Sequence, residues 1–423
     1  MPTSRLRSRV LLLAAALPVA LSAQGLPRAT AEAVGLSSTA LARIAPALKA
    51  HVDSGHFAGF AFAIARHGKL AYEGAVGDMN GRGVPMRTDA LFRIFSMTKA
   101  VTAAALMQQL ERGTVRLDDP VSKFIPAFSR TKVYAGGPAA APQLADLTRP
   151  ITIEDLLLHD AGLTYGAFGN SPVDSIYRRT KLLAPDATLE QFADAIAALP
   201  LVFQPGARWN YSMAMDVIAR VVEVASGERY DRYLAAHLFE PLDMRETAHH
   251  VAKGQESRLV VMDGRGPGGA LVRGPEAVGL DLRDEGALFA GGHGLVSTLA
   301  DYLRFTQMLL NGGTLDGTRV LSAQSVTTMM QNHLSAALMP VPSATGWTGY
   351  GQGYGGVVLV DSAASRTPAS PGTYRWCGVA GTFFFVDPKR DLIAMVWGQR
   401  ANGCPSAVSD DFERLVYAAI AGR

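Results

Sequence analysis

The sequence predicts a mixed α+β fold, in which both ends of the chain build an antiparallel sheet and a mostly helical region is inserted between them. Two observations predict the sheet, because each end of the chain carries a pair of apolar runs separated by a short polar turn. A third observation predicts the insertion, since apolar residues recur at helical spacing through the middle of the chain. The 423 residues, 48% of them hydrophobic, suffice to bury a large core.

The strands are expected near both termini. An early hairpin is predicted over residues 59–74, where two apolar runs flank the turn His67-Gly68-Lys69. A late hairpin is predicted from the runs 381–386 and 392–399, because the segment between them is polar and contains Pro388. The sheet is therefore expected to occupy two segments, about residues 30–90 and 350–423.

Helices are predicted in the inserted region, which spans about residues 91–349. Three segments carry the pattern most clearly, and each is followed within two residues by glycine, which is common just past the end of a helix. These segments are residues 99–112, 213–226 and 299–310.

The N-terminus has the pattern of a cleavable secretory signal peptide. Arg5, Arg7 and Arg9 precede the apolar run 10–17, and small residues follow near Gln24. The run is shorter than the ~20 residues that cross a bilayer. We expect a signal peptide at residues 1–23, one large domain at 24–423, a periplasmic or secreted location, and no stable membrane span after cleavage. An uncleaved membrane anchor is the alternative.

Charge and composition narrow the classes of partner. The three arginines of the N-terminal stretch account for the formal net charge of +3, so the remaining chain holds equal numbers of basic and acidic residues. A neutral chain gives no electrostatic basis for binding nucleic acid or an anionic membrane. A small neutral molecule fits better as the ligand or substrate. The sequence has no C-x-x-C and no H-E-x-x-H motif, so we expect no metal site and no cofactor.

Ser96-Met97-Thr98-Lys99 is the candidate nucleophile motif. It opens a predicted helix, where residues three apart share one face and free backbone N–H groups favour developing negative charge. A serine hydroxyl is inert until a neighbouring base takes its proton, and Lys99 is placed to assist. A serine activated in this way attacks an ester or amide carbonyl, so we expect a small-molecule ester or amide as substrate. Taken alone, the motif favours the simpler interpretation, in which Ser96 is only a helix cap and Lys99 a solvated residue of the first turn.

The same four-residue pattern occurs a second time, at Ser129-Arg130-Thr131-Lys132. This copy follows Pro126 and precedes a loop rich in Gly, Pro and Ala, without apolar periodicity after it. A serine and a lysine on such a loop are not held in register. The context therefore favours Ser96.

Two further segments carry candidate site residues. Tyr211 lies just before a predicted helix, and its phenol can carry a proton if a cation such as Lys99 stabilises the phenolate. Trp376, Gly378 and Val379 lead into the late hairpin, where closely spaced glycines allow a substrate to approach the backbone.

These three segments together resemble the motifs of the β-lactamase-related serine hydrolases, which include class C β-lactamases, D-alanyl-D-alanine carboxypeptidases and family VIII carboxylesterases. Two further landmarks agree: residues 156–163 are similar to the family's Leu-Leu-x-His-x-x-Gly-Leu, and residues 291–298 to its Gly-Gly-x-Gly-Leu-x-Ser-Thr. The resemblance covers most of the chain after residue 23 and implies a class C β-lactamase-like fold.

The resemblance also implies roles for individual residues. Ser96 would be the nucleophile, Lys99 and Tyr211 would share the base and acid duties, and the backbone N–H groups of Ser96 and Val379 would form the oxyanion hole. Gly378 and Trp376 would flank that hole at the substrate. His159 and His293 would then be structural, not members of a Ser-His-Asp triad.

Two departures from the family pattern bear on the substrate. Met213 stands where the β-lactamases and peptidases have an asparagine, and Trp376 where they have a cation that faces a carboxylate. Both replacements resemble the family VIII esterases and favour a carboxylesterase acting on small uncharged esters. The alternatives are a β-lactamase or D-amino-acid-specific peptidase, and a non-catalytic binding relative.

Cys377 and Cys404 are the only two cysteines. In an oxidising compartment a pair this close in sequence can form a disulfide, and two inert buried thiols are the alternative.

Overall fold

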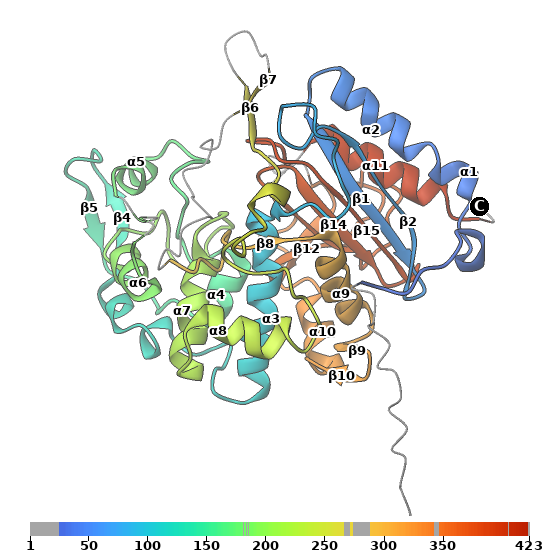
Figure 1. Ribbon diagram of the computed structural model, residues 1–423. Helices are drawn as coiled ribbons and strands as arrows, with labels where there is room; N and C mark the ends of the chain where they lie inside the picture. Colours follow the sequence, from blue (N-terminus) through green and yellow to red (C-terminus); the bar gives the residue numbers. More distant parts are fainter. Residues whose placement is uncertain are drawn as a thin grey trace, which may run out of the picture.

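The computed structural model describes residues 25–180, 182, 184, 186–265, 271–273, 288–341, 347–404 and 406–421. The predicted signal peptide lies outside these residues. A seven-stranded antiparallel sheet made from both ends of the chain lies beside the inserted helical region, which confirms the predicted fold class (Figure 1). Its strands, in spatial order, are β11 (Tyr350–Gly353), β12 (Gly356–Leu359), β13 (Tyr374–Gly378), β14 (Thr382–Asp387), β15 (Leu392–Trp397), β1 (Gly59–Arg66) and β2 (Lys69–Gly77).

Helices cover both faces of this sheet (Figure 1). On one side α2 (Ile44–Asp53) and α11 (Ala407–Ala418) pack against each other and against β1, β2 and β15. On the other side α9 (Leu299–Leu310) packs against β1, β14 and β15.

The register of the strands accounts for these two layers. Trp397 lies opposite Ala61, the neighbour of Phe62, so Phe62 and Trp397 point to opposite faces of the sheet. The ring of Phe62 meets Phe412 of α11, with centroids 6.4 Å apart. The ring of Trp397 meets Tyr302 of α9, at 5.8 Å. Because side chains alternate along the strands, one face of the sheet packs against α2 and α11 and the other against α9.

The inserted region is organised around α3 (Thr98–Glu111), whose residues 98–109 are all buried. A helix that is buried on all sides needs neighbours all round. These include α7 (Ala214–Ser226) and α10 (Ala323–Met329). The predicted helix 99–112 is therefore central to the molecule, and it begins and ends one residue earlier than expected.

The remaining elements are short and surround this centre. The other α-helices are α1 (Ser38–Leu41), α4 (Ile153–Leu158), α5 (Pro172–Arg179), α6 (Leu189–Ala197) and α8 (Tyr230–Leu234). Four two-stranded pairs are β3 (Phe92–Arg93) with β8 (Val296–Ser297), β4 (Val133–Gly136) with β5 (Gln143–Ala145), β6 (Asp263–Arg265) with β7 (Leu271–Arg273), and β9 (Thr314–Leu315) with β10 (Thr318–Arg319). Within the described ranges, no helix has the length and apolarity that crossing a bilayer requires.

Candidate active site

Ser96 lies where the chain turns sharply from β3 into α3. The turn is a single 3₁₀ turn, Phe95–Met97, and Phe95 adopts a positive φ of 44°. This conformation is costly for a residue with a side chain, and it persists where the surroundings hold it in place. Here the buried ring of Phe95 packs with Met262 and Ala380. The packing of Phe95 thus places Ser96 at the start of the central helix.

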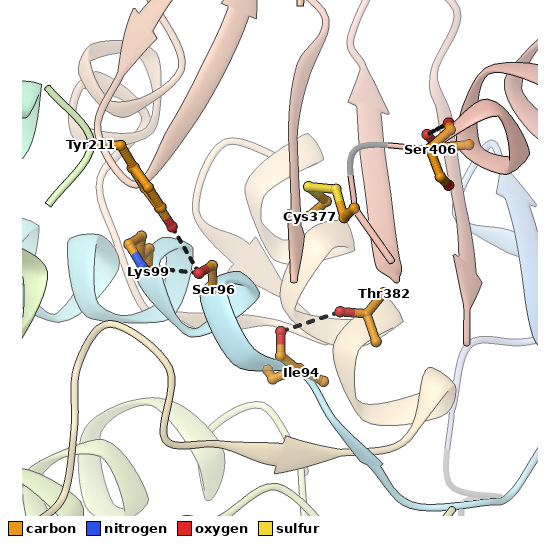
Figure 2. The surroundings of a disulfide bond; sticks show 9 residues. Ile94, Ser96, Lys99, Tyr211, Cys377, Thr382 and Ser406 are labelled. Atoms are coloured by element: carbon orange, nitrogen blue, oxygen red, sulfur yellow. Dashed lines mark hydrogen bonds between the residues drawn. A yellow bond between two sulfur atoms is a disulfide. The ribbon is translucent and has the colours of Figure 1, made fainter. Parts of the chain in front are cut away.

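The structure brings the three predicted catalytic residues together around one atom. The phenol of Tyr211 donates to Ser96 Oγ at 2.7 Å, and Lys99 Nζ donates to the same oxygen at 3.1 Å (Figure 2). Ser96 lies in the 3₁₀ turn that leads into α3 and Lys99 in the first turn of α3, whereas Tyr211 comes from the segment before α7. The serine oxygen therefore has two partners through which its proton can leave.

Lys99 is fully buried, and its charge is compensated by oxygen atoms. Besides Ser96, it donates to Tyr165 Oη at 2.9 Å and to the backbone oxygen of Gly292 at 2.6 Å. The buried carboxylate of Asp216 accepts the N–H of Gly292 at 2.7 Å and so holds this acceptor in place. All three N–H donors of the ammonium group are used.

Tyr165 is a site residue that the sequence did not reveal. Burial raises its pKa well above the usual value for tyrosine, and the nearby Tyr211 and Asp216 raise it further. Tyr165 therefore stays a neutral phenol and serves as a polar contact for Lys99. It follows the Gly162-Leu163 landmark by two residues, and no spacing rule links it to Lys99, 66 positions away.

His159 and His293 do not contact Ser96. His159 packs against the ring of Tyr211, with centroids 4.9 Å apart, and its Nδ1 lies 3.2 Å from Ser212 Oγ. Burial, with a smaller effect from the charge of Lys99, lowers the pKa of His159 to about 3. A histidine that stays neutral at every ordinary pH supports its neighbours by packing and hydrogen bonding.

Aromatic side chains line the site around Tyr211. Trp209 stacks on Tyr211 at 6.3 Å between centroids, and Trp376 lies 5.6 Å from it. Trp347 meets Trp376 edge-on at 4.5 Å. Phe168 lies 5.9 Å from Tyr211 and remains 65% exposed. This wall is apolar and uncharged. Met213 is buried and stands at the N-terminal end of α7.

The end of β13 lies directly against the segment that leads into Ser96. A Cβ atom at Gly378 would lie 2.4 Å from the oxygen of Ile94, so only glycine fits this approach. Thr382 Oγ1 donates to the same oxygen at 3.2 Å (Figure 2). The next residue, Val379, has a backbone N–H that no acceptor in the described part of the chain takes.

The second Ser-x-x-Lys copy has a different environment. Ser129 Oγ donates to the oxygen of Pro126 at 2.7 Å, and Lys132 forms an ion pair with Asp146. The serine and the lysine are thus engaged with other partners. This agrees with the choice of Ser96 from its context.

Cys377 and Cys404 are joined in a disulfide, with their Cα atoms 6.2 Å apart. Cys377 belongs to β13, and Cys404 to the loop between β15 and α11. The described residues hold no group of three or more His, Cys, Asp or Glu side chains placed to bind a metal ion.

Comparisons with known proteins show the family to which the chain is similar. The chain matches the protein family described as Beta-lactamase over residues 44–419. It is 36% identical to the protein Rv1367c of Mycobacterium tuberculosis, across 80% of this chain and 83% of that protein. It is 32% identical to the esterase EstB of Burkholderia gladioli, across 91% and 99% of the two chains.

Among solved structures, the chain superimposes on EstCE1, described as a hydrolase with promiscuous acyltransferase activity, with a TM-score of 0.76. The two are 27% identical, and the match covers 90% of this chain and 99% of the other.

Proposed function

The chain belongs to the beta-lactamase family of serine hydrolases, and from this membership we propose that it is a carboxylesterase that hydrolyses small uncharged esters through an acyl-enzyme on Ser96. One observation carries the proposal: Ser96 Oγ accepts hydrogen bonds from both Tyr211 and Lys99. A hydroxyl becomes a nucleophile when a positioned base removes its proton, and both partners stand within proton-transfer distance.

In the proposed acylation step, Tyr211 acts as the base and Lys99 holds the groups around it by hydrogen bonds. Lys99 directs its three donors to Ser96, Tyr165 and Gly292, and its Nζ lies 4.8 Å from the centre of the Tyr211 ring. Acting as the base, the deprotonated oxygen of Tyr211 takes the serine proton while Ser96 Oγ bonds to the ester carbonyl carbon. The carbonyl oxygen becomes an oxyanion, which the N–H groups of Ser96 and Val379 stabilise.

The intermediate then collapses, and the carbon–oxygen bond to the leaving alcohol breaks. Tyr211 returns its proton to that alcohol, which departs and leaves the acyl group on Ser96. In deacylation, water takes the place of the alcohol, gives its proton to Tyr211 and releases the carboxylic acid. The serine regains its proton at the end, so the catalyst is unchanged.

The lining of the site supports an uncharged ester over an anionic lactam or a peptide C-terminus. Trp376 and Met213 occupy the two positions where a cation and an amide would hold such a substrate, and neither offers a charge. Trp209, Trp376 and Phe168 offer apolar area instead.

The test compares Ser96→Ala with Ser129→Ala on p-nitrophenyl acetate and butyrate. We expect Ser96→Ala to lose activity and Ser129→Ala to retain it, and intact mass spectrometry to show an acyl adduct on native protein alone. Unchanged hydrolysis by Ser96→Ala would overturn the proposal. Faster turnover of a chromogenic cephalosporin than of either ester would replace the esterase with a β-lactamase, and a protein unreactive toward esters, lactams and fluorophosphonates would be a binding relative.

We also propose that the protein is exported to the periplasm or secreted. It is supported by the arginine-rich apolar pattern of residues 1–23 and by the disulfide, which is typical of oxidising compartments. N-terminal mass analysis of the protein purified from its native host should find a chain that begins after residue 23. A full-length cytosolic protein would contradict this part.

A further inference from the structure

The turn between β13 and β14 carries Val379, whose N–H the proposed function assigns to the oxyanion. Gly381 N donates to the oxygen of Gly378 at 2.8 Å and closes the turn. Gly381 has a φ of +87°, and a Cβ atom there would meet the ring of Phe57 at 2.5 Å. The turn thus has the shape of a three-residue hairpin connection with glycine in the left-handed position.

The outer side of this turn rests on the loop that follows β15. Gly403 N donates to the oxygen of Val379 at 2.7 Å, Arg400 N to that of Ala380 at 2.7 Å, and Gly398 N to that of Gly381 at 3.1 Å. Three successive carbonyl groups of the turn are therefore held by residues 398–403. The backbone position of Val379 depends on where this loop lies.

The two ends of the loop are fixed in different ways. Its first half pairs with the segment at Asp263, since Asp263 N donates to the oxygen of Gln399 at 2.7 Å and Ala401 N to the oxygen of Asp263 at 2.8 Å. Its second half is fixed by the disulfide, because Cys404 directly follows Gly403. The bridge joins Cys404 to Cys377, two residues before Val379 (Figure 2).

These links close a small ring. It runs from Cys377 through Gly378 to Val379, across the hydrogen bond to Gly403, and back through Cys404 and the disulfide. Within such a ring the donor at Gly403 cannot move far from the oxygen of Val379. If the disulfide opens, the position of Gly403 relative to Val379 depends on that hydrogen bond and on the packing of the loop against the turn.

The bridge does not act by touching substrate. Cys377 follows Trp376 along β13, so their side chains point to opposite faces of the sheet. Trp376 faces the site, where it packs against Tyr211. The influence of the disulfide on catalysis must therefore pass through the backbone of the turn.

From this arrangement we propose that the Cys377–Cys404 disulfide is a positioning element of the oxyanion hole, and that the rate of acyl transfer at Ser96 depends on its redox state. The proposal rests on the proposed function, which supplies the oxyanion. The redox step is an ordinary exchange with a thiol reductant: two reductant thiols lose two electrons and two protons and become a disulfide, while the protein disulfide becomes two thiols.

The experiment compares the oxidised protein, the same protein reduced with dithiothreitol, and the variant Cys377→Ser/Cys404→Ser on p-nitrophenyl acetate, well below the melting temperature. Loss of one oxyanion donor costs about 10²–10³ in kcat, so partial displacement should lower kcat about tenfold or more, with KM within about twofold. Reoxidation should restore kcat, and the double variant should be equally slow with and without reductant. Because the chain has only two cysteines, a reductant effect on folded protein comes from this pair.

A transition-state readout separates positioning from a merely structural link. A trifluoromethyl ketone adds to Ser96 and forms the oxyanion, so its affinity should fall by the same factor as kcat/KM when the bridge is reduced. A disulfide that only stabilises the fold would lower the melting temperature and leave both quantities unchanged at low temperature. That outcome would overturn the inference.

Gly403→Ala provides a second test in which the disulfide remains intact. A Cβ atom at Gly403 would lie 2.8 Å from the oxygen of Arg400 in the loop and 3.0 Å from backbone atoms of Ala380 and Gly381 in the turn, so the loop backbone has to shift where it contacts the turn. We expect the same selective loss of kcat in this variant, even if the double serine variant does not fold. Native kcat in Gly403→Ala would contradict the proposal, while activity in Ser96→Ala would instead refute the proposed function.

Discussion

The side chain of Tyr211 makes two separable contributions, one through its hydroxyl and one through its ring. The hydroxyl reaches Ser96 Oγ at 2.7 Å, whereas the ring packs between Trp209 and Trp376. Replacing tyrosine with phenylalanine removes the first and keeps the second.

Tyr211→Phe should therefore lower kcat for p-nitrophenyl acetate by about 10²–10⁴, the range of general acid–base catalysis, with KM changed by less than about threefold. Steady-state kinetics with Tyr165→Phe as the matched control checks this expectation. The control loses one acceptor of Lys99 but leaves Ser96 untouched, so its loss should be smaller. Equal kcat in native protein and Tyr211→Phe would remove Tyr211 from the proton path.

Asp160 is a buried carboxyl group beside the Arg149–Asp155 ion pair, and its protonation affects the stability of the fold. Burial, and then the charge of Asp155, raise the pKa of Asp160 to about 7, while Arg149 opposes the shift. Its Oδ1 has no hydrogen-bond partner among the described residues. In the unfolded chain its pKa returns to about 4. The native state therefore binds the extra proton between about pH 4 and pH 7, and stability falls as the pH rises through that window.

Asp160→Asn mimics the protonated acid at every pH and should remove this loss. We expect its melting temperature to equal that of native protein near pH 4 and to exceed it by about 2 °C or more at pH 8. Thermal unfolding at both pH values measures the difference. A variant less stable than native protein at pH 8 would show that the ionised carboxylate is the form that the fold prefers.

At the scale of elements, the loop 164–171 between α4 and α5 presents Phe168 at the site. Arg178 of α5 donates to the oxygen of Gly169 at 2.9 Å and also to that of Gly166, and so ties both sides of the loop tip to the helix. Asp174 holds the end of the loop by accepting from the N–H of Ser171 at 2.8 Å. The hydrogen bonds from α5 thus hold the loop tip in place, while the ring of Phe168 remains exposed beside Tyr211.

Phe168→Ala should lower kcat/KM about tenfold for esters with a long or aromatic acyl group, because a phenyl ring that becomes buried against substrate contributes about 1.5 kcal/mol. The acetate ester carries only a methyl group on its acyl side, so it has little apolar area to lose against the ring and should keep its native rate. A panel of p-nitrophenyl esters of increasing chain length checks this, with Phe168→Leu as the conservative control. A uniform loss across the panel would point to a disturbed Tyr211 and not to lost substrate contact.

Across the whole molecule, the sequence predicted those features that depend on residues close together in the chain. The Ser96–Lys99 pair, the two hairpins and the helices of the inserted region depend on periodicity and on three-residue offsets. The contacts of Lys99 with Tyr165 and Gly292 could not be predicted in this way, because they join residues 66 and 193 positions apart. Strands β11 and β12 were not predicted as separate elements, because glycine, which is unfavourable inside strands, occupies every second position from 349 to 355 and β12 has only four residues.

The C-terminal helix α11 is joined to the sheet by a buried ion pair that no local pattern indicates. Arg375 of β13 and Glu413 of α11 meet at 2.8 Å, and both are buried. The guanidinium also lies 5.1 Å from the ring of Tyr350 and 4.6 Å from that of Phe383. One arginine thus connects three strands of the sheet to the helix that ends the fold.

Glu413→Ala would leave the charge of Arg375 buried without its partner, and breaking such a pair costs about 3–5 kcal/mol. We expect the midpoint of urea unfolding to fall accordingly. The double variant Arg375→Met/Glu413→Leu replaces both charges with apolar groups of similar size and should recover most of the loss, since the desolvation cost of both charges is then removed. If the double variant is no more stable than Glu413→Ala, the pair contributes specific attraction between α11 and the sheet that apolar packing cannot replace. Recovery would instead show that the arginine needs its glutamate only because the fold buries it.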